Sequence, residues 1–329
     1  MTTGGFSYAL AIFRQDGAPL GQFPLEGLLD WEPAIQWTRH AALRAGRGQG
    51  WRDAGQVQPI WHRRRGAPVL SGVRVEVIAR DERIRAGCEF GTTYFADAAQ
   101  ALSAGLVHAG ELVDGERITF VAMAVPERET PQQVSRLARR LVVRDDSPDL
   151  PVTDGSFTDA IANADRMGEP VLEDEIPVIA AACVLEDIDA LSRRAGALET
   201  GGALVGHIVR DSRERQVFVT VTGQIPARHT EASAVRLAFT ADTWQDIRRQ
   251  VALRADGDIL LGWWHSHPDG LDHCFSEHDR ALHRTVFSAA HSVAIVASRP
   301  EPDVVACSAW GWHRGTLVRK GLFVRRAAP

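Results

Sequence analysis

A short apolar run that ends in two histidines constrains this sequence more than any other feature. Residues 259–264 read Ile-Leu-Leu-Gly-Trp-Trp, and His265-Ser-His267-Pro268 follows directly. So short an apolar run predicts a buried strand rather than a helix. Because successive side chains of a strand point to opposite faces, we expect His265 and His267 on one face, about 7 Å apart along the strand. Pro268 cannot join a sheet ladder, so it marks the end of the strand.

Two imidazoles on one face at a strand end are the kind of donor pair that zinc prefers. Downstream, Ser276-Glu-His-Asp279 adds a carboxylate, and three protein ligands with an open fourth position are typical of a catalytic zinc site. Ser276 also precedes a helical pattern at 277–287 that it can cap, with Asp279 in the first turn. Capping does not exclude ligation. Spacing alone does not reject three further ligands nearby, Asp272, His273 and His278.

Together these residues resemble the motif of the JAMM (MPN-plus, or JAB) zinc metalloproteases. That motif is an upstream Glu, then His-(Ser/Thr)-His-Pro, then Ser-x-x-Asp, and its counterparts here are Glu199, residues 265–268 and residues 276–279. Glu199 begins the segment Glu-Thr-Gly-Gly-Ala-Leu-Val-Gly, which is similar to the Glu-x-x-Gly-x-Leu-x-Gly of the family. One departure is the loop before the Ser, where residues 268–275 number eight and the family has seven. The resemblance covers roughly residues 175–320.

The resemblance implies a role for each motif residue. One Zn²⁺ per chain would be held by His265, His267 and Asp279. Glu199 would act as the general base that takes a proton from the attacking water and returns it to the leaving amine. Ser276 would donate a hydrogen bond to the oxyanion that develops on the scissile carbonyl.

The function that the resemblance implies is that of a zinc-dependent isopeptidase or peptidase. Its substrate would be a ubiquitin-like protein or its conjugates, which it would deconjugate or mature, and the same pathway would supply activating and conjugating enzymes as partners. Both an isopeptide and a linear peptide bond remain open, as does the identity of the modifier. The alternative is a non-catalytic MPN-type scaffold that binds a ubiquitin-like protein or its conjugation machinery, and the intact motif argues against it.

Other zinc hydrolases fit the sequence less well. A metallo-β-lactamase site needs His-x-His-x-Asp-His, and Gly270 stands where the last His should be. An amidohydrolase barrel carries His-x-His on its first strand, but only about 60 residues follow here, too few for seven more βα units. Zinc deaminases need His-x-Glu and a later Cys-x-x-Cys, whereas the four cysteines are scattered.

Composition predicts a soluble, cytoplasmic protein with no nucleic-acid or membrane partner. The 37 Lys and Arg residues are outnumbered by 42 Asp and Glu residues, so no basic excess favours nucleic acid. Neither a signal-peptide pattern nor an apolar stretch of membrane length is present, and the unpaired cysteines suit a reducing compartment. Richness in Ala, Arg, Gly and Asp suggests a bacterial source.

We expect an α/β protein in three parts. Residues 1–126 form a separate α+β domain of unknown role, and residues 127–170 form a helix at 130–143 followed by a linker rich in Asp, Pro and Gly. Residues 171–329 form the MPN (JAB)-type mixed sheet with flanking helices. Strands in this third part are expected at 176–182, 201–209, 216–223, 259–264, 292–297, 304–312 and 317–325, and helices at 185–195, 240–253 and 277–287.

Overall fold

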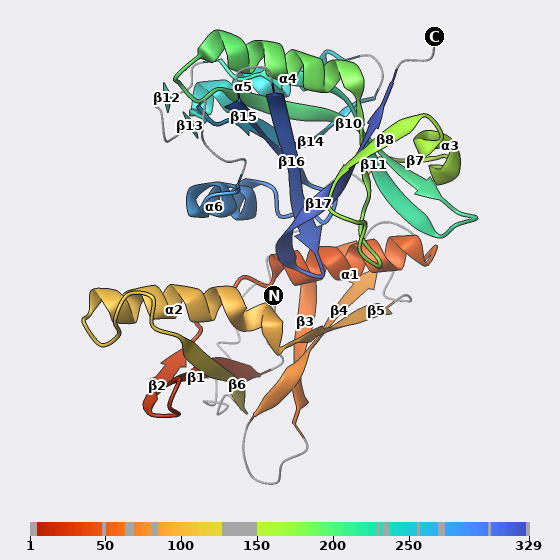
Figure 1. The fold of residues 1–329 in the computed structure, drawn as a ribbon. Coiled ribbons are helices and arrows are strands. Elements are labelled where there is room, and N and C mark those ends of the chain that lie inside the picture. The colour runs from red at the N-terminus through yellow and green to blue at the C-terminus, as the bar shows by residue number, and fades with distance from the viewer. Residues whose placement is uncertain are drawn as a thin grey trace, which may run out of the picture. The chain divides into compact units, whose positions relative to one another are not determined.

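The computed structural model describes most of the chain, in two compact units (Figure 1). The described residues are 5–47, 51–62, 69–79, 85–126, 150–228, 231–232, 237–254, 257–268, 274–301 and 304–326. One unit comprises Met1–Ala42 and Gly48–Asp149, and the other Leu43–Arg47 and Leu150–Pro329. The helix expected at 130–143 lies outside the described residues. None of the helices in the described residues has the length and apolar character that a membrane span needs.

In its described residues, the N-terminal unit combines two three-stranded antiparallel sheets with two α-helices. The sheets are β2-β1-β6 and β3-β4-β5. In chain order the elements are β1 (Phe6–Arg14), β2 (Pro19–Pro24), α1 (Glu32–Arg44), β3 (Trp51–Trp61), β4 (Leu70–Ala79), β5 (Arg85–Gly91), the 3-10 turn η1 (Thr92–Phe95), α2 (Ala96–His108) and β6 (Ile118–Pro126). On β4, Val73, Val75 and Val77 are fully buried, as the alternation of apolar and charged residues predicts for a strand with one buried face.

The C-terminal unit is a mixed sheet that closes on itself. Its strands follow the order β11-β9-β17-β16-β15-β14-β10, and β11 also pairs with β10, which completes the ring. The elements are β7 (Val152–Asp154), α3 (Phe157–Ile161), β8 (Ala164–Gly168), β9 (Val178–Ala181), α4 (Ala182–Ala195), β10 (Gly201–Asp211), β11 (Gln216–Pro226), β12 (Glu231–Ala232), β13 (Leu237–Ala238), α5 (Ala241–Ala252), β14 (Ile259–Ser266), α6 (Glu277–Val286), β15 (Val293–Glu301), β16 (Val304–His313) and β17 (Thr316–Arg325). The mixed α/β sheet is present, but as a closed barrel with few helices, a closure that the strand pattern does not predict.

The segment that follows residue 150 belongs to this sheet. From the sequence it is expected to be part of a linker, but β7 pairs in parallel with β10 and β8 pairs antiparallel with β17. Most side chains of both strands are exposed, so neither shows an apolar pattern. Edge strands of this kind are held through backbone hydrogen bonds along one side, which a search for apolar periodicity does not detect.

Strand β14 runs between β10 and β15 in the ring. Gly201 of β10 lies opposite His265 in an antiparallel ladder, and Val296 of β15 lies opposite it in a parallel one. The two tryptophans of β14, Trp263 and Trp264, are 1% and 0% exposed and project to opposite faces, as strand alternation requires. Trp263 joins an aromatic cluster with Phe275, Phe287 and Trp312.

Gly262 on β14 leaves no room for a side chain. An added Cβ would lie 1.7 Å from the carbonyl oxygen of Val293 on β15, an overlap with backbone that no rotamer change relieves. Gly262→Ala is therefore expected to lower the free energy of unfolding by about 3 kcal/mol, the upper end for overpacked cores. Chemical denaturation measures this loss. The control is Gly105→Ala in α2, where the added Cβ meets open space; equal midpoints for the two variants would contradict the pairing of β14 with β15.

Candidate metal centre

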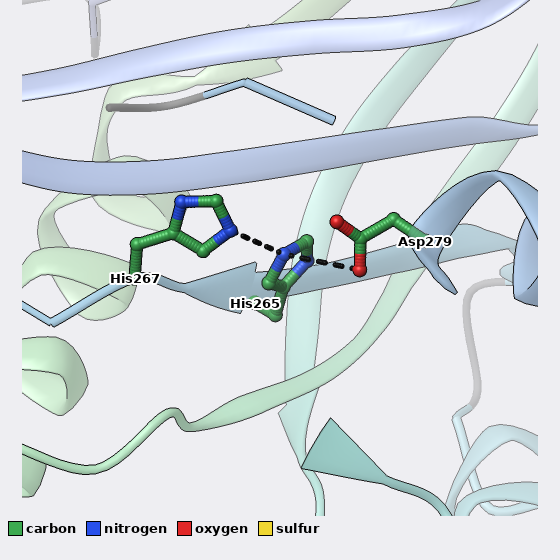
Figure 2. A group of neighbouring side chains, drawn as sticks. All are labelled: His265, His267 and Asp279. Carbon is green, nitrogen blue, oxygen red and sulfur yellow. Dashed lines mark hydrogen bonds and ion pairs between the residues drawn. The ribbon is translucent and has the colours of Figure 1, made fainter. Parts of the chain in front are cut away.

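His265 and His267 stand at the end of β14, where the ladders to both neighbouring strands continue. The backbone N–H of Ser266 donates to Thr200 O, and that of His267 donates to Ala297 O, both at 2.8 Å. These bonds keep the backbone extended, so the two imidazoles share one face. Their ring centroids lie 5.0 Å apart and their Nε2 atoms 3.2 Å apart (Figure 2).

Asp279 approaches the histidines from the first turn of α6. Ser276 is the N-cap of this helix: its Oγ accepts a hydrogen bond from the Asp279 N–H at 3.2 Å. In return, Oδ2 of Asp279 accepts from the N–H and the hydroxyl of Ser276, at 2.8 and 2.7 Å. The other carboxylate oxygen, Oδ1, lies 3.4 Å from Nε2 of His265. Asp279 therefore uses one oxygen in a capping box and turns the other toward the histidines.

The three side chains form a compact donor group. One ligand atom from each of His265, His267 and Asp279 lies within 4.8 Å of the others. His265 and Asp279 are 1% and 6% exposed, and His267 is partly exposed. Two imidazole nitrogens and a carboxylate oxygen are the ligands that zinc takes at catalytic sites. Because three donor atoms converge in a largely buried place, a divalent cation fits the group.

The other candidate ligands do not join this group in the described residues. His278 is exposed on α6 and is not part of the donor group. Asp272 and His273 lie outside the described residues. The loop before Ser276 is one residue longer than in the JAMM motif, and Asp279 still reaches His265. No second group of this kind occurs within the parts of the chain that the structure describes.

Glu199 lies next to the donor group, two residues before the start of β10. It is 8% exposed. Burial raises its pKa above the ordinary value of 4.5, the charge of His265 lowers it, and that of Asp279 raises it further. Burial would also raise the pKa of Asp279, but the hydrogen bond and charge of His265 and the bonds from Ser276 outweigh it and bring that pKa to about 2. The carboxyl group of Asp279 thus stays ionised, as a metal ligand must. That of Glu199 binds a proton more readily, as a general base requires.

Ser276 sits at the rim of the group with its hydroxyl engaged. The residue is exposed, and its Oγ–H is directed at Oδ2 of Asp279. In this arrangement Ser276 orients Asp279. Donation to an oxyanion would require the hydroxyl to turn away from that carboxylate.

Two residues at the site are not assigned a role there by the sequence motif. The ring of Trp263 stacks on His265, and the indole N–H of Trp263 donates to Nδ1 of His283 at 3.2 Å. The sequence holds one weak signal for His283, its position four residues after Asp279, which puts both on the same face of α6.

Comparison with known proteins identifies the domain that carries this site. Residues 182–311 match the family model for prokaryotic homologs of the JAB domain. These residues form a prokaryotic JAB domain. The JAB domain extends from α4 into β16 and contains His265, His267 and Asp279 as well as Glu199 and Ser276. The JAB family includes peptidases and non-catalytic scaffolds.

Other comparisons add little to this assignment. The solution structure of a protein from Desulfitobacterium hafniense matches with 21% sequence identity and a TM-score of 0.36, covering 46% of this chain and 94% of the other. No curated protein matches the sequence.

Proposed function

We propose that the JAB domain is a zinc-dependent peptidase that cleaves the bond at the C-terminal carboxyl of a ubiquitin-like modifier. The observation that carries the proposal is the convergence of His265, His267 and Asp279, with one ligand atom of each within 4.8 Å of the others. Buried Glu199 beside them supports it. A binding scaffold needs neither a complete ligand set nor a buried carboxylate with a raised pKa.

Each residue has a task in amide hydrolysis. Zinc, when bound by the two histidines and Asp279, supplies water whose pKa is lowered to about 7. Glu199 accepts a proton from the attacking water and passes it to the amine nitrogen as the C–N bond breaks. Ser276, once its hydroxyl leaves Asp279, donates to the oxygen of the attacked carbonyl, and such a donor is worth about 3 kcal/mol elsewhere.

The substrate part of the proposal comes from the resemblance to JAMM proteases, since a fold alone does not define a substrate. A ubiquitin-like protein offers an extended C-terminal tail, and tails of this type bind by adding a strand to a sheet edge. The attached group would be a lysine side chain or a following polypeptide. We assign to the N-terminal unit the recognition of the modifier, its target or a pathway enzyme.

The test is cleavage by the full-length protein of ubiquitin-like proteins fused at their C-termini to a reporter. We expect one cut, directly after the modifier, that a zinc chelator stops and added Zn²⁺ restores. A non-chelating isomer of the same chelator is the matched control. Tight binding of such fusions without any cut by the zinc-loaded protein would instead favour the scaffold function.

A further inference from the structure

The imidazole of His265 is oriented in an unusual way for a metal ligand. In most zinc sites the second ring nitrogen donates to a carboxylate or a carbonyl, which fixes the direction of the ring. Here Nδ1 of His265 is buried and has no hydrogen-bond partner among the described residues. The ring instead lies flat against Trp263, two residues earlier on the strand, with centroids 4.8 Å apart and planes inclined by 12°. The contact that the structure shows for the ring of His265 on this side is therefore a stacked one.

A hydrogen bond fixes Trp263 in turn. Its Nε1 donates to Nδ1 of His283 at 3.2 Å. His283 is 0% exposed and lies on α6, one turn after Asp279. Three aromatic rings enclose it with centroids 5.9, 5.8 and 5.8 Å away, those of Phe275, Phe287 and Trp312.

His283 is in the form that this hydrogen bond needs. Burial, with smaller contributions from the positive charges of Lys320 and Arg284, lowers its pKa to about 3, so the ring is neutral at physiological pH. A neutral imidazole carries one proton, and acceptance at Nδ1 places that proton on Nε2. Nε2 has no hydrogen-bond partner among the described residues, so within these residues Trp263 is the hydrogen-bond partner of this side chain.

We propose that Trp263 and His283 are positioning residues for the metal centre. The ring of Trp263 orients His265, and its hydrogen bond to His283 ties this ring to α6, the helix that carries Asp279. The bond thereby sets the direction of the His265 imidazole and its distance from Asp279. The inference rests on the proposed metal site and not on the substrate or on peptidase activity.

The same core offers a matched control for packing. Trp312 is buried like Trp263, and its Nε1 donates to the carbonyl oxygen of Phe287 at 2.7 Å. No ring contact between Trp312 and His265 is found within the described residues. Trp312→Phe removes an equivalent buried hydrogen bond but keeps an aromatic ring against His283, so the bond from Trp263 is retained. Among substitutions of His283, Asn and Leu have similar shapes, and Asn alone can accept the bond from Trp263.

The experiment measures zinc affinity of the full-length variants by competition with a chromophoric chelator, and ligand geometry by the visible absorption of Co²⁺ in place of zinc. We expect Trp263→Phe and His283→Leu each to weaken zinc binding by about 10- to 100-fold, as loss of a ligand's supporting contact does elsewhere, and to alter the Co²⁺ spectrum. The double variant should be no weaker than the worse single one, because both remove the same bond. His283→Asn should stay close to the wild type, and Trp312→Phe should lose stability but keep its affinity and spectrum.

Two outcomes would overturn the inference, and they differ in whether they also refute the metal site. If the wild type binds zinc and Trp263→Phe and His283→Leu bind it as tightly as Trp312→Phe, the positioning role is wrong and the metal site stands. If the wild type itself binds no zinc, the metal site and the positioning role fail together. Should Trp263→Phe not fold, the comparison of His283→Leu with His283→Asn decides the same question, since that pair differs in the acceptor.

Discussion

Glu199→Gln is expected to bind zinc like the wild type but to lose cleavage by about 100- to 10,000-fold, the usual contribution of a positioned general base. Glutamine keeps the shape of the side chain, but its amide cannot accept a proton from water at neutral pH. Glu199 lies outside the group of three ligand atoms, so metal content should not depend on its charge. The measurement is the rate of release of a ubiquitin-like protein from its fused partner, with zinc determined on the same samples.

A second acid near the site provides the control for this variant. Glu277→Gln, on the first turn of α6, makes the same change in charge, and its side chain is 75% exposed. It should cleave nearly as fast as the wild type. If Glu199→Gln also retains full activity, another group supplies the base, and if it loses zinc, Glu199 supports the metal directly.

Replacement of both His265 and His267 by Ala is expected to reduce zinc from one ion per chain to none. Only the carboxylate of Asp279 would remain of the donor group, and a single oxygen ligand does not provide the nitrogen donors on which zinc sites of this kind depend. The aromatic cluster around Trp263 stays intact in this variant, so the protein should still fold. Elemental analysis after dialysis, with circular dichroism of the same preparation, gives the result.

His278→Ala is the matched control for the metal measurement. His278 lies beside Asp279 in sequence but is exposed and outside the donor group, so its removal should leave one zinc per chain. Undiminished zinc in the double variant would show that the ligands lie elsewhere. The alternatives that the sequence offers would then be Asp272 and His273.

Much of the local structure around the site follows from the sequence through short-range rules. An apolar run of strand length predicts β14, and strand alternation alone puts His265 and His267 on one face. Ser276 at the start of a helical pattern, with Asp279 three residues later, predicts the cap that the structure has. These features depend on backbone geometry and on neighbours within a few residues, so they can be derived without a tertiary structure.

Residues 150–168 show where short-range rules stop. They carry mostly exposed side chains, and so polar a segment is typical of a linker. Whether they form β7 and β8 depends on free backbone donors and acceptors along β10 and β17, which are distant in the sequence. Closure of the ring also depends on segments that are distant in the sequence, because β9 pairs with both β11 and β17. A hydrogen bond between strands leaves no mark on the composition of either one.

The sequence by itself determined the donor types, the shared face of the two histidines and the cap that holds Asp279. Only the tertiary structure decided that Asp279 meets His265, that buried Glu199 has its pKa raised beside them, and that Trp263 bonds His283 behind the ligand. The physical reason is that burial, pKa shifts and the direction of a ring depend on which distant segments pack together. A residue pattern limits the chemistry available at a site, whereas packing sets its distances and charges.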